Sequence, residues 1–153
     1  MPEMLNEQPQ VAATSSIPQA PGKVPCAEAL QLVLHAAQSV RTLHESGQLH
    51  GAISIQAIRV DAATQSVTLA APGTSCSFGG PFSAPDHCPP VLRRREVIEL
   101  PTDADSARQI LASAGISLEP TWIDIYQLGT LLCRLVTGEP VSAYLSSPRT
   151  KAA

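Results

Sequence analysis

The sequence predicts a mainly α-helical domain that contains one small β-hairpin. Apolar residues recur at spacings of three and four over residues 27–46 and fill most positions of residues 122–137, which is typical of two helices with buried faces. Two short β-prone runs, 57–60 and 66–69, lie between them. The sequence has 153 residues, 44% of them apolar, which is enough for one domain of ordinary size.

The predicted domain covers residues 26–140. Residues 1–25, which precede it, are rich in proline, glutamine, alanine and serine and show no hydrophobic periodicity. Such a segment buries too little apolar surface to offset its ordering entropy, so we expect a disordered tail. The first helix, 27–46, follows directly, and Gly47 stands where a left-handed C-terminal cap would end it.

The middle of the chain contains the predicted hairpin, a long loop and a short helix. A turn-like segment, 61–65, joins the two β-prone runs. Residues 71–101 are punctuated by glycine and proline, which disfavours regular structure and indicates an ordered or partly ordered loop. Residues 103–114 favour a short helix that Thr102 would cap and Gly115 would end.

The last predicted helix, 122–137, is apolar on most of its circumference, so we expect it to be buried. Thr121 is placed to cap it and Gly138 to end it. The short polar tail, 141–153, would leave part of this helix wet, at a cost of about 1.5–3 kcal/mol for each large side chain. We therefore expect either a protein partner or further C-terminal helices to cover it, and we favour a truncated sequence.

Charge and composition exclude several classes of partner. The net charge is −3, and the basic residues are scattered apart from the arginine triplet 93–95, so we expect no nucleic acid. For the triplet itself we favour a solvated loop over an anion site. No apolar run approaches the roughly 20 residues of a membrane span. The four cysteines form no closely spaced zinc-ligand pairs, and no signal peptide precedes them, so we expect a cytoplasmic protein without a metal site.

Four short motifs follow one another along the chain. Residues 50–58 read His-Gly-Ala-Ile-Ser-Ile-Gln-Ala-Ile, residues 67–73 read Val-Thr-Leu-Ala-Ala-Pro-Gly, and residues 84–86 read Ala-Pro-Asp. Residues 124–140 begin Asp-Ile-Tyr-Gln-Leu-Gly-Thr and end Thr-Gly-Glu-Pro. In this order they resemble the catalytic loop, the strand ending in Asp-Phe-Gly, the Ala-Pro-Glu motif and the central buried helix of serine/threonine protein kinases. The resemblance implies a partial protein-kinase C-terminal lobe, with a longer segment than usual between the last two motifs.

The same resemblance implies that the residues for phosphoryl transfer are missing. The catalytic aspartate aligns with Ala52, and the two magnesium ligands of the family align with Ala57 and Ala71. Ser54 replaces the catalytic-loop lysine. Methyl groups offer no oxygen to a proton or to magnesium, and residues 1–25 contain no glycine-rich phosphate loop or N-lobe. We therefore expect no catalytic residue and no cofactor, with ATP and magnesium relevant only if the chain is an enzyme after all.

The resemblance also implies which residues maintain the scaffold. His50 would pack inward, Gly73 would permit a sharp turn, and Asp124 would accept backbone N–H bonds from the loop at 50–58. Asp86 and Gly129 match two further motif positions. The alternative for Asp124 is a first-turn acidic residue favoured by the helix dipole, and for His50 a metal or acid–base role. We expect the other histidines on the surface or in loops: His35, His44 and His87.

The function that follows is a noncatalytic, pseudokinase-like scaffold or interaction module. The first alternative is an atypical serine/threonine kinase that transfers phosphate from ATP, with its missing parts supplied by a longer chain or a partner. The second is an unrelated small helical interaction domain. Magnesium-dependent nucleotide binding separates the first alternative from the scaffold, and the absence of a hairpin between the two long helices would favour the second.

Overall fold

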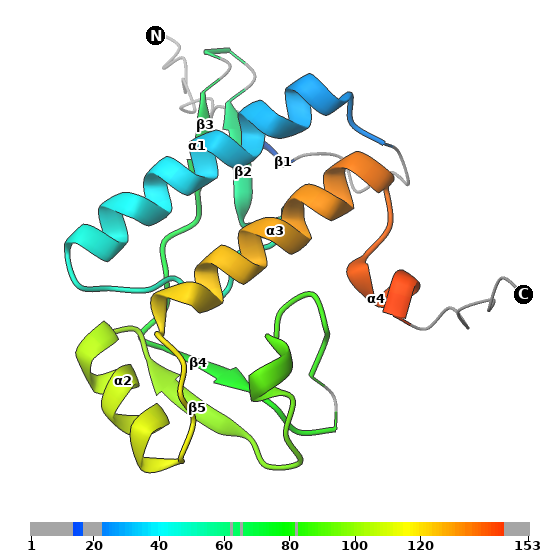
Figure 1. The fold of residues 1–153 in the computed structure, drawn as a ribbon. Helices are drawn as coiled ribbons and strands as arrows, with labels where there is room; N and C mark the ends of the chain where they lie inside the picture. Colours follow the sequence, from blue (N-terminus) through cyan, green and yellow to red (C-terminus); the bar gives the residue numbers. More distant parts are fainter. Residues whose placement is uncertain (1–13, 17–22, 62, 65, 82, 146–153) are drawn as a thin grey trace, which may run out of the picture.

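The structure is a computed structural model that describes residues 14–16, 23–61, 63–64, 66–81 and 83–145. Helices predominate in this part of the chain, and the strands form two small antiparallel sheets (Figure 1). The predicted class, mainly α with a small hairpin, is confirmed. The second sheet is an addition that the sequence analysis did not predict.

Helix α1 spans Cys26–Glu45, close to its predicted bounds. Its C-cap is Ser46, and Gly47 follows with a φ of 80°, the left-handed conformation that glycine adopts without a steric cost. The helix therefore ends at the position that Gly47 predicted for its C-terminus. One face is buried, and its residues keep the spacing of three and four seen in the sequence: Ala29, Leu32, Ala36 and Val40.

The predicted hairpin is present as β2, Ile58–Asp61, and β3, Val67–Leu69, with Ile58 opposite Leu69. A third strand, β1 (Thr14–Ser16), pairs antiparallel with the other edge of β2. The predicted tail without regular structure, 1–25, is therefore wrong for these three residues, because the open edge of β2 offers unpaired backbone groups that a passing segment can satisfy. Most of the remaining tail lies outside the described residues.

The second sheet corrects the prediction of a loop over residues 71–101. Strand β4 spans Ser75–Phe78 and pairs with β5, Ile98–Pro101, while a 3₁₀ turn, Pro90–Leu92, lies between them. In β4, Cys76 and Phe78 are buried and their neighbours are exposed. This alternation extends over only four residues and is surrounded by glycine and proline, so local pattern did not reveal it.

Helix α2, Ala104–Ser113, confirms the predicted short helix, but its cap is Asp103 rather than Thr102. The Asp103 carboxylate accepts a hydrogen bond from the Ser106 N–H at 2.9 Å. Thr102 is buried at the end of β5, where its hydroxyl donates to the Gly73 carbonyl at 3.2 Å. Thr102 therefore directly follows β5 and its hydroxyl is already bonded, so the next residue, Asp103, caps α2.

Helix α3 spans Thr121–Thr137 and ends at Gly138, whose φ is 76°. Its N-cap is Pro120, and Thr121 makes no capping bond, so the predicted cap is wrong. A short helix, α4 (Val141–Leu145), occupies the start of the predicted C-terminal tail. Helices α1 and α3 lie side by side and run in opposite directions (Figure 1).

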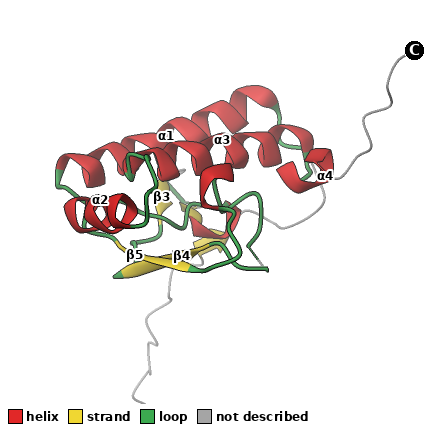
Figure 2. Ribbon diagram, turned by 60° about the horizontal axis from the view of Figure 1, so that its bottom comes forward, coloured by secondary structure: helices red, strands yellow, loops and turns green. Residues whose placement is uncertain are grey.

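Two apolar clusters share α3. One gathers around β4, β5 and α2 and includes Ile123 at the start of α3, while the other gathers around α1, β2 and β3 and includes Leu131 and Leu135. Figure 2 shows the long helices on one side of the molecule and β4 and β5 on the other. The prediction that the whole of this helix is buried holds for one side of α3 only, because Trp122 and Ile125 are 66% and 60% exposed.

Candidate functional site

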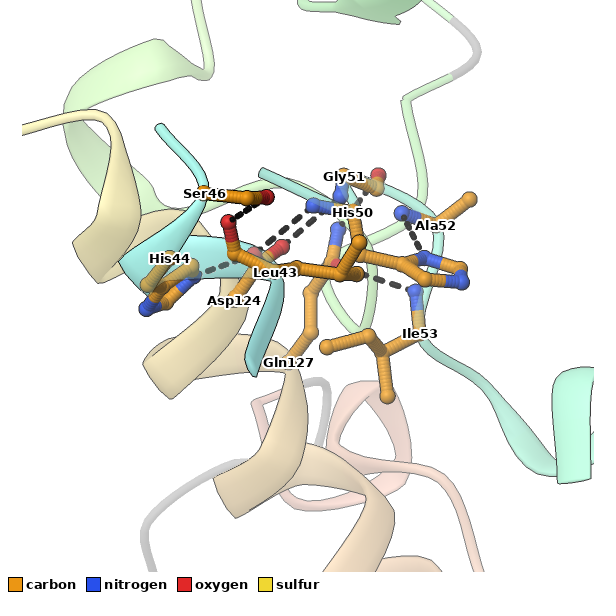
Figure 3. A network of polar contacts seen from close by, with 9 residues as sticks. All are labelled: Leu43, His44, Ser46, His50, Gly51, Ala52, Ile53, Asp124 and Gln127. Carbon is orange, nitrogen blue, oxygen red and sulfur yellow. Dashed lines mark hydrogen bonds and ion pairs between the residues drawn. The ribbon is translucent and has the colours of Figure 1, made fainter. Parts of the chain in front are cut away.

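The candidate site is the loop of residues 50–57, which lies between the two apolar clusters. Asp124, in the first turn of α3, is fully buried beside it. Its carboxylate accepts hydrogen bonds from the backbone N–H groups of His50, at 2.8 Å, and Gly51, at 2.7 Å (Figure 3). These are the bonds that the kinase resemblance implied for Asp124. A carboxylate with two N–H donors is adequately compensated for the loss of water.

A histidine from α1 completes the surroundings of this carboxylate. The Nε2 atom of His44 lies 2.7 Å from Oδ2 of Asp124, and its side chain is only 19% exposed. His44 was predicted to lie on the surface. The prediction failed because the packing of α1 against α3 brings together residues that are 80 positions apart in the sequence.

His50 is buried, as expected, and both of its ring nitrogens have backbone partners. Nε2 lies 2.6 Å from the Ala70 carbonyl, and Nδ1 accepts the Ala52 N–H at 3.2 Å. Because a carbonyl can only accept and an N–H can only donate, the ring is neutral and carries its proton on Nε2. His50 therefore orients the loop and has no nitrogen left for a ligand.

Gln127 is a second buried support that the sequence analysis missed. Its Oε1 accepts the Ile53 N–H at 2.9 Å, and its Nε2 donates to the carbonyls of Gly51 and His87, both at 2.9 Å. The available signal was a polar residue three positions after Asp124, which puts both side chains on one face of an otherwise apolar helix. His87 is also drawn in, and its ring stacks on Phe78 with centroids 4.8 Å apart.

The four substituted motif positions lie on two adjoining segments. The Ala70 N–H donates to the Ala57 carbonyl at 2.7 Å, which joins the loop to the end of β3. Ala57 is buried, whereas Ala52 and Ala71 are exposed and Ser54 is half-buried. The alanines present only methyl groups there. These residues therefore do not fit a magnesium ion, which requires oxygen ligands.

Gly51 has a steric role that the sequence analysis did not identify. Its φ is 76°, and a Cβ at this position would lie 2.5 Å from the sulfur of Cys76. A residue with a side chain would meet both backbone strain and a clash. The close approach also places Cys76 near the carboxylate, and burial, assisted by the charge of Asp124, raises the pKa of the Cys76 thiol to about 12.

The other motif residues have varied surroundings. Gly73 was expected to permit a sharp turn; its φ is not positive and a Cβ there would make only an ordinary contact, so nothing at this position requires glycine. Asp86 accepts the Val141 N–H at 2.6 Å and so holds the start of α4. Gly129 is exposed, with nothing within 4 Å of a Cβ position. His35 is exposed, as predicted.

A pocket of about 340 Å³ opens beside the loop. The loop forms one wall through Ile53 and Ser54, and α3 forms another through Thr130 and Arg134. Asp86 also lines it. A mixture of apolar, hydroxyl and oppositely charged groups is suited to a small polar ligand or a side chain of a partner.

Comparisons with known proteins found no match to this chain. A scan against protein-family models found no match, and searches of curated proteins and of solved structures found none either. Over the described residues, no three His, Cys, Asp or Glu side chains are grouped so that they could hold a metal ion. Within the same part of the chain, every helix is too short or too polar to cross a membrane.

Proposed function

We propose that this chain is a noncatalytic, kinase-like module that binds protein partners. One observation carries the proposal: buried polar side chains hold the loop of residues 50–57, yet alanines stand where a kinase needs oxygen. Ala52 and Ala71 are both exposed at this loop and at the segment beside it. A solvent-facing methyl group neither accepts a proton from a substrate hydroxyl nor binds magnesium.

The buried polar side chains that hold this loop need a reason to be there, because an apolar core would be simpler. Asp124 and Gln127 are both fully buried, and together they pair with the backbone of His50, Gly51 and Ile53. Burial of a carboxylate costs several kcal/mol, and the hydrogen bonds to such partners do little more than offset that cost. These side chains therefore contribute little net stability over an apolar replacement. Their benefit is a fixed loop conformation. A fixed loop without acid–base groups favours a scaffold over an enzyme.

The surface of α3 supports a binding role. Trp122 and Ile125 are 66% and 60% exposed, and Leu132 and Val136 are half-buried. With Gly129 these residues, which we call the α3 stripe, recur at alternating spacings of three and four. That spacing is the pattern by which one helix packs against another. Full burial of one such large side chain contributes about 1.5–3 kcal/mol.

An amphipathic helix of another protein is the occupant that this surface fits best. Beside the stripe, a groove of about 480 Å³ runs between α1 and α3, with apolar Val40 and Leu128 in its wall. Arg41 and Glu45 line it too, and they form an exposed ion pair at 3.0 Å, so the groove places both charges beside the flanks of a helix. The open space at Gly129 allows a helix backbone to approach closely.

The noncatalytic part of the proposal is tested by a thermal-shift titration with ATP, with and without magnesium. A ligand that binds the folded state raises the melting temperature, by an amount that follows its occupancy. We expect a cooperative melt that neither nucleotide nor magnesium changes, and no phosphate transfer to a protein substrate. A magnesium-dependent shift accompanied by transfer would overturn the proposal in favour of the atypical kinase.

The partner surface is tested through Trp122, the sole tryptophan of the sequence. We expect its fluorescence to shift to the blue when heptad-patterned helical peptides with acidic, basic or neutral flanks are added. Ile125→Glu should abolish the shift, while Ile110→Glu, at a residue of α2 that is 38% exposed, should retain it. A shift that survives Ile125→Glu contradicts the proposed surface. A blue shift that grows with protein concentration alone identifies a second copy as the occupant.

A further inference from the structure

The arginine triplet lines a cleft that is separate from the loop and from the α3 stripe. Gly80 and Ser83 form one side of this cleft, Arg93, Arg94 and Arg95 form the other, and its volume is about 520 Å³. All three arginines are exposed, as the prediction of a solvated loop requires. The structure adds that they line a common space with Ser83, and that Nη1 of Arg94 also donates to the Ala114 carbonyl at 3.5 Å.

The guanidinium of Arg93 is held in position. Its Nε donates to the Cys88 carbonyl at 2.9 Å, and its Nη2 donates to the Tyr126 hydroxyl at 2.5 Å and to the Pro85 carbonyl at 3.3 Å. These bonds leave the two Nη1 hydrogens for a ligand. A guanidinium that is already oriented loses less side-chain entropy when it binds an anion.

In the described part of the chain, no ion pair neutralises the positive charge of the cleft. The ion pairs found in the described part of the chain involve Arg41, His44 and Arg108, and none involves the triplet. None of the described residues that line the cleft carries a carboxylate. Three like charges at one concave surface repel one another, and concave surfaces focus the field that they produce. An anion with more than one charge would relieve that repulsion.

The two sides of the cleft are held at a fixed separation. The Gly80 N–H donates to the Arg94 carbonyl at 2.7 Å. Gly79 and Gly80 have φ values of 86° and 79°, and a Cβ on Gly79 would lie 2.5 Å from the Glu96 carbonyl oxygen. The glycine pair thus allows the two segments to approach more closely than residues with side chains would. A fixed separation favours an anion of definite size.

We propose that this cleft binds a phosphoryl group, supplied as inorganic phosphate or as a phosphate monoester. A phosphoryl group carries about −1.5 to −2 charges at neutral pH and three acceptor oxygens, which suits several guanidiniums better than a single carboxylate does. The Ser83 hydroxyl, which accepts the Gly79 N–H at 3.3 Å, retains its own hydrogen to donate. The site does not depend on the kinase-like reading of the chain.

The experiment is a titration followed by ¹⁵N–¹H NMR and calorimetry, with inorganic phosphate and with O-phosphoserine as probes at constant ionic strength. We expect saturable shifts of the Gly80, Ser83 and Arg95 amides for both probes, and tighter binding of O-phosphoserine would identify a monoester as the preferred source. Arg94→Ala/Arg95→Ala should weaken binding at least about tenfold. The control, Lys23→Ala/Arg59→Ala, removes the same charge from other exposed positions and should bind normally.

Two results would overturn the phosphoryl site. One is a set of shifts that sodium chloride reproduces at equal ionic strength, because simple screening would then account for them. The other is equal weakening in both double variants, because net charge alone would then be responsible. Gly79→Ala provides an independent check, since it disturbs the cleft without removing a charge, and its binding should fall even though all three arginines remain.

Discussion

At the scale of single residues, Asp124 links the sequence most directly to the loop. Its carboxylate is fully buried and accepts the N–H groups of His50 and Gly51, with His44 at 2.7 Å as a third partner. Within the described residues, the N–H groups of His50 and Gly51 bond only to this carboxylate. The stability of the loop therefore depends on this one side chain.

We predict that Asp124→Asn lowers the free energy of unfolding by about 2–4 kcal/mol. An amide has one acceptor oxygen, so one backbone N–H would face the NH₂ group and remain unsatisfied. Urea unfolding measures the change. Asp105→Asn is the matched control, because that side chain is 85% exposed and should change stability by no more than about 1 kcal/mol. Equal effects of the two substitutions would contradict the support role.

A second residue-scale prediction concerns Gly51. Gly51→Ala should destabilise the protein by about 2–4 kcal/mol, because a positive φ and overpacking against Cys76 add to each other. In a double-mutant cycle, Cys76→Ala should recover the part due to the clash and leave the part due to backbone strain. Thermal unfolding of the four proteins provides the measurement. Strict additivity of the two substitutions would show that the sulfur contact costs nothing.

At the scale of elements, α3 contains a residue of low helix propensity in its middle. Gly129 is exposed within the helix, where glycine costs about 1 kcal/mol relative to alanine. We predict that Gly129→Ala raises the free energy of unfolding by about 0.5–1 kcal/mol. Gly47→Ala is the control, since its site is equally open but its φ of 80° should make alanine destabilising. A loss of stability at Gly129 would contradict the open space assigned to the α3 stripe.

The cap of α2 predicts a pH dependence. Hydrogen bonds from the side chain and backbone of Ser106 lower the pKa of the Asp103 carboxyl. A carboxyl whose folded pKa is lowered stabilises the fold above its unfolded pKa, about 3.9, and this stabilisation is lost as the pH falls through the folded value. Asp103→Asn keeps a capping oxygen but removes the charge. Its melting temperature should lie below that of the native chain at pH 7 and converge with it in acid; a constant difference would contradict the assignment.

At the scale of the whole molecule, α3 joins two apolar clusters that have no described residue in common. Ile123 belongs to the cluster with β4, β5 and α2, and Leu135 belongs to the cluster with α1. The polar supports, Asp124 and Gln127, lie on the helix between these two residues. Disruption of either cluster would leave one end of α3 without the side chains against which it packs.

We therefore predict a single cooperative unfolding transition. Leu111→Ala in the first cluster and Leu135→Ala in the second should each shift that one transition by about 2–4 kcal/mol, because both side chains are fully buried. Circular dichroism reports the helices, and the fluorescence of Trp122 reports the start of α3. Coincident curves are expected. Separate transitions, with each substitution affecting only one, would show that the clusters fold independently.

The sequence by itself determined the elements whose signal is local. The bounds of α1, the β2–β3 hairpin and the glycine that ends α3 all follow from hydrophobic spacing and turn residues within one short segment. The bonds from Asp124 to the loop were also anticipated, through the order of the motifs. That resemblance remains a proposal as an account of origin and function.

Only the tertiary structure decided what depends on distant partners. The pairing of Ser75–Phe78 with Ile98–Pro101 joins two segments that lie too far apart in the sequence to fall within the short window over which periodicity is read. His44 and Gln127 entered the polar network because α1 and α3 pack side by side, and the arginines became a candidate site because Gly80 lies against them. Such contacts depend on interactions between residues that are far apart in the sequence, and local periodicity carries no information about them.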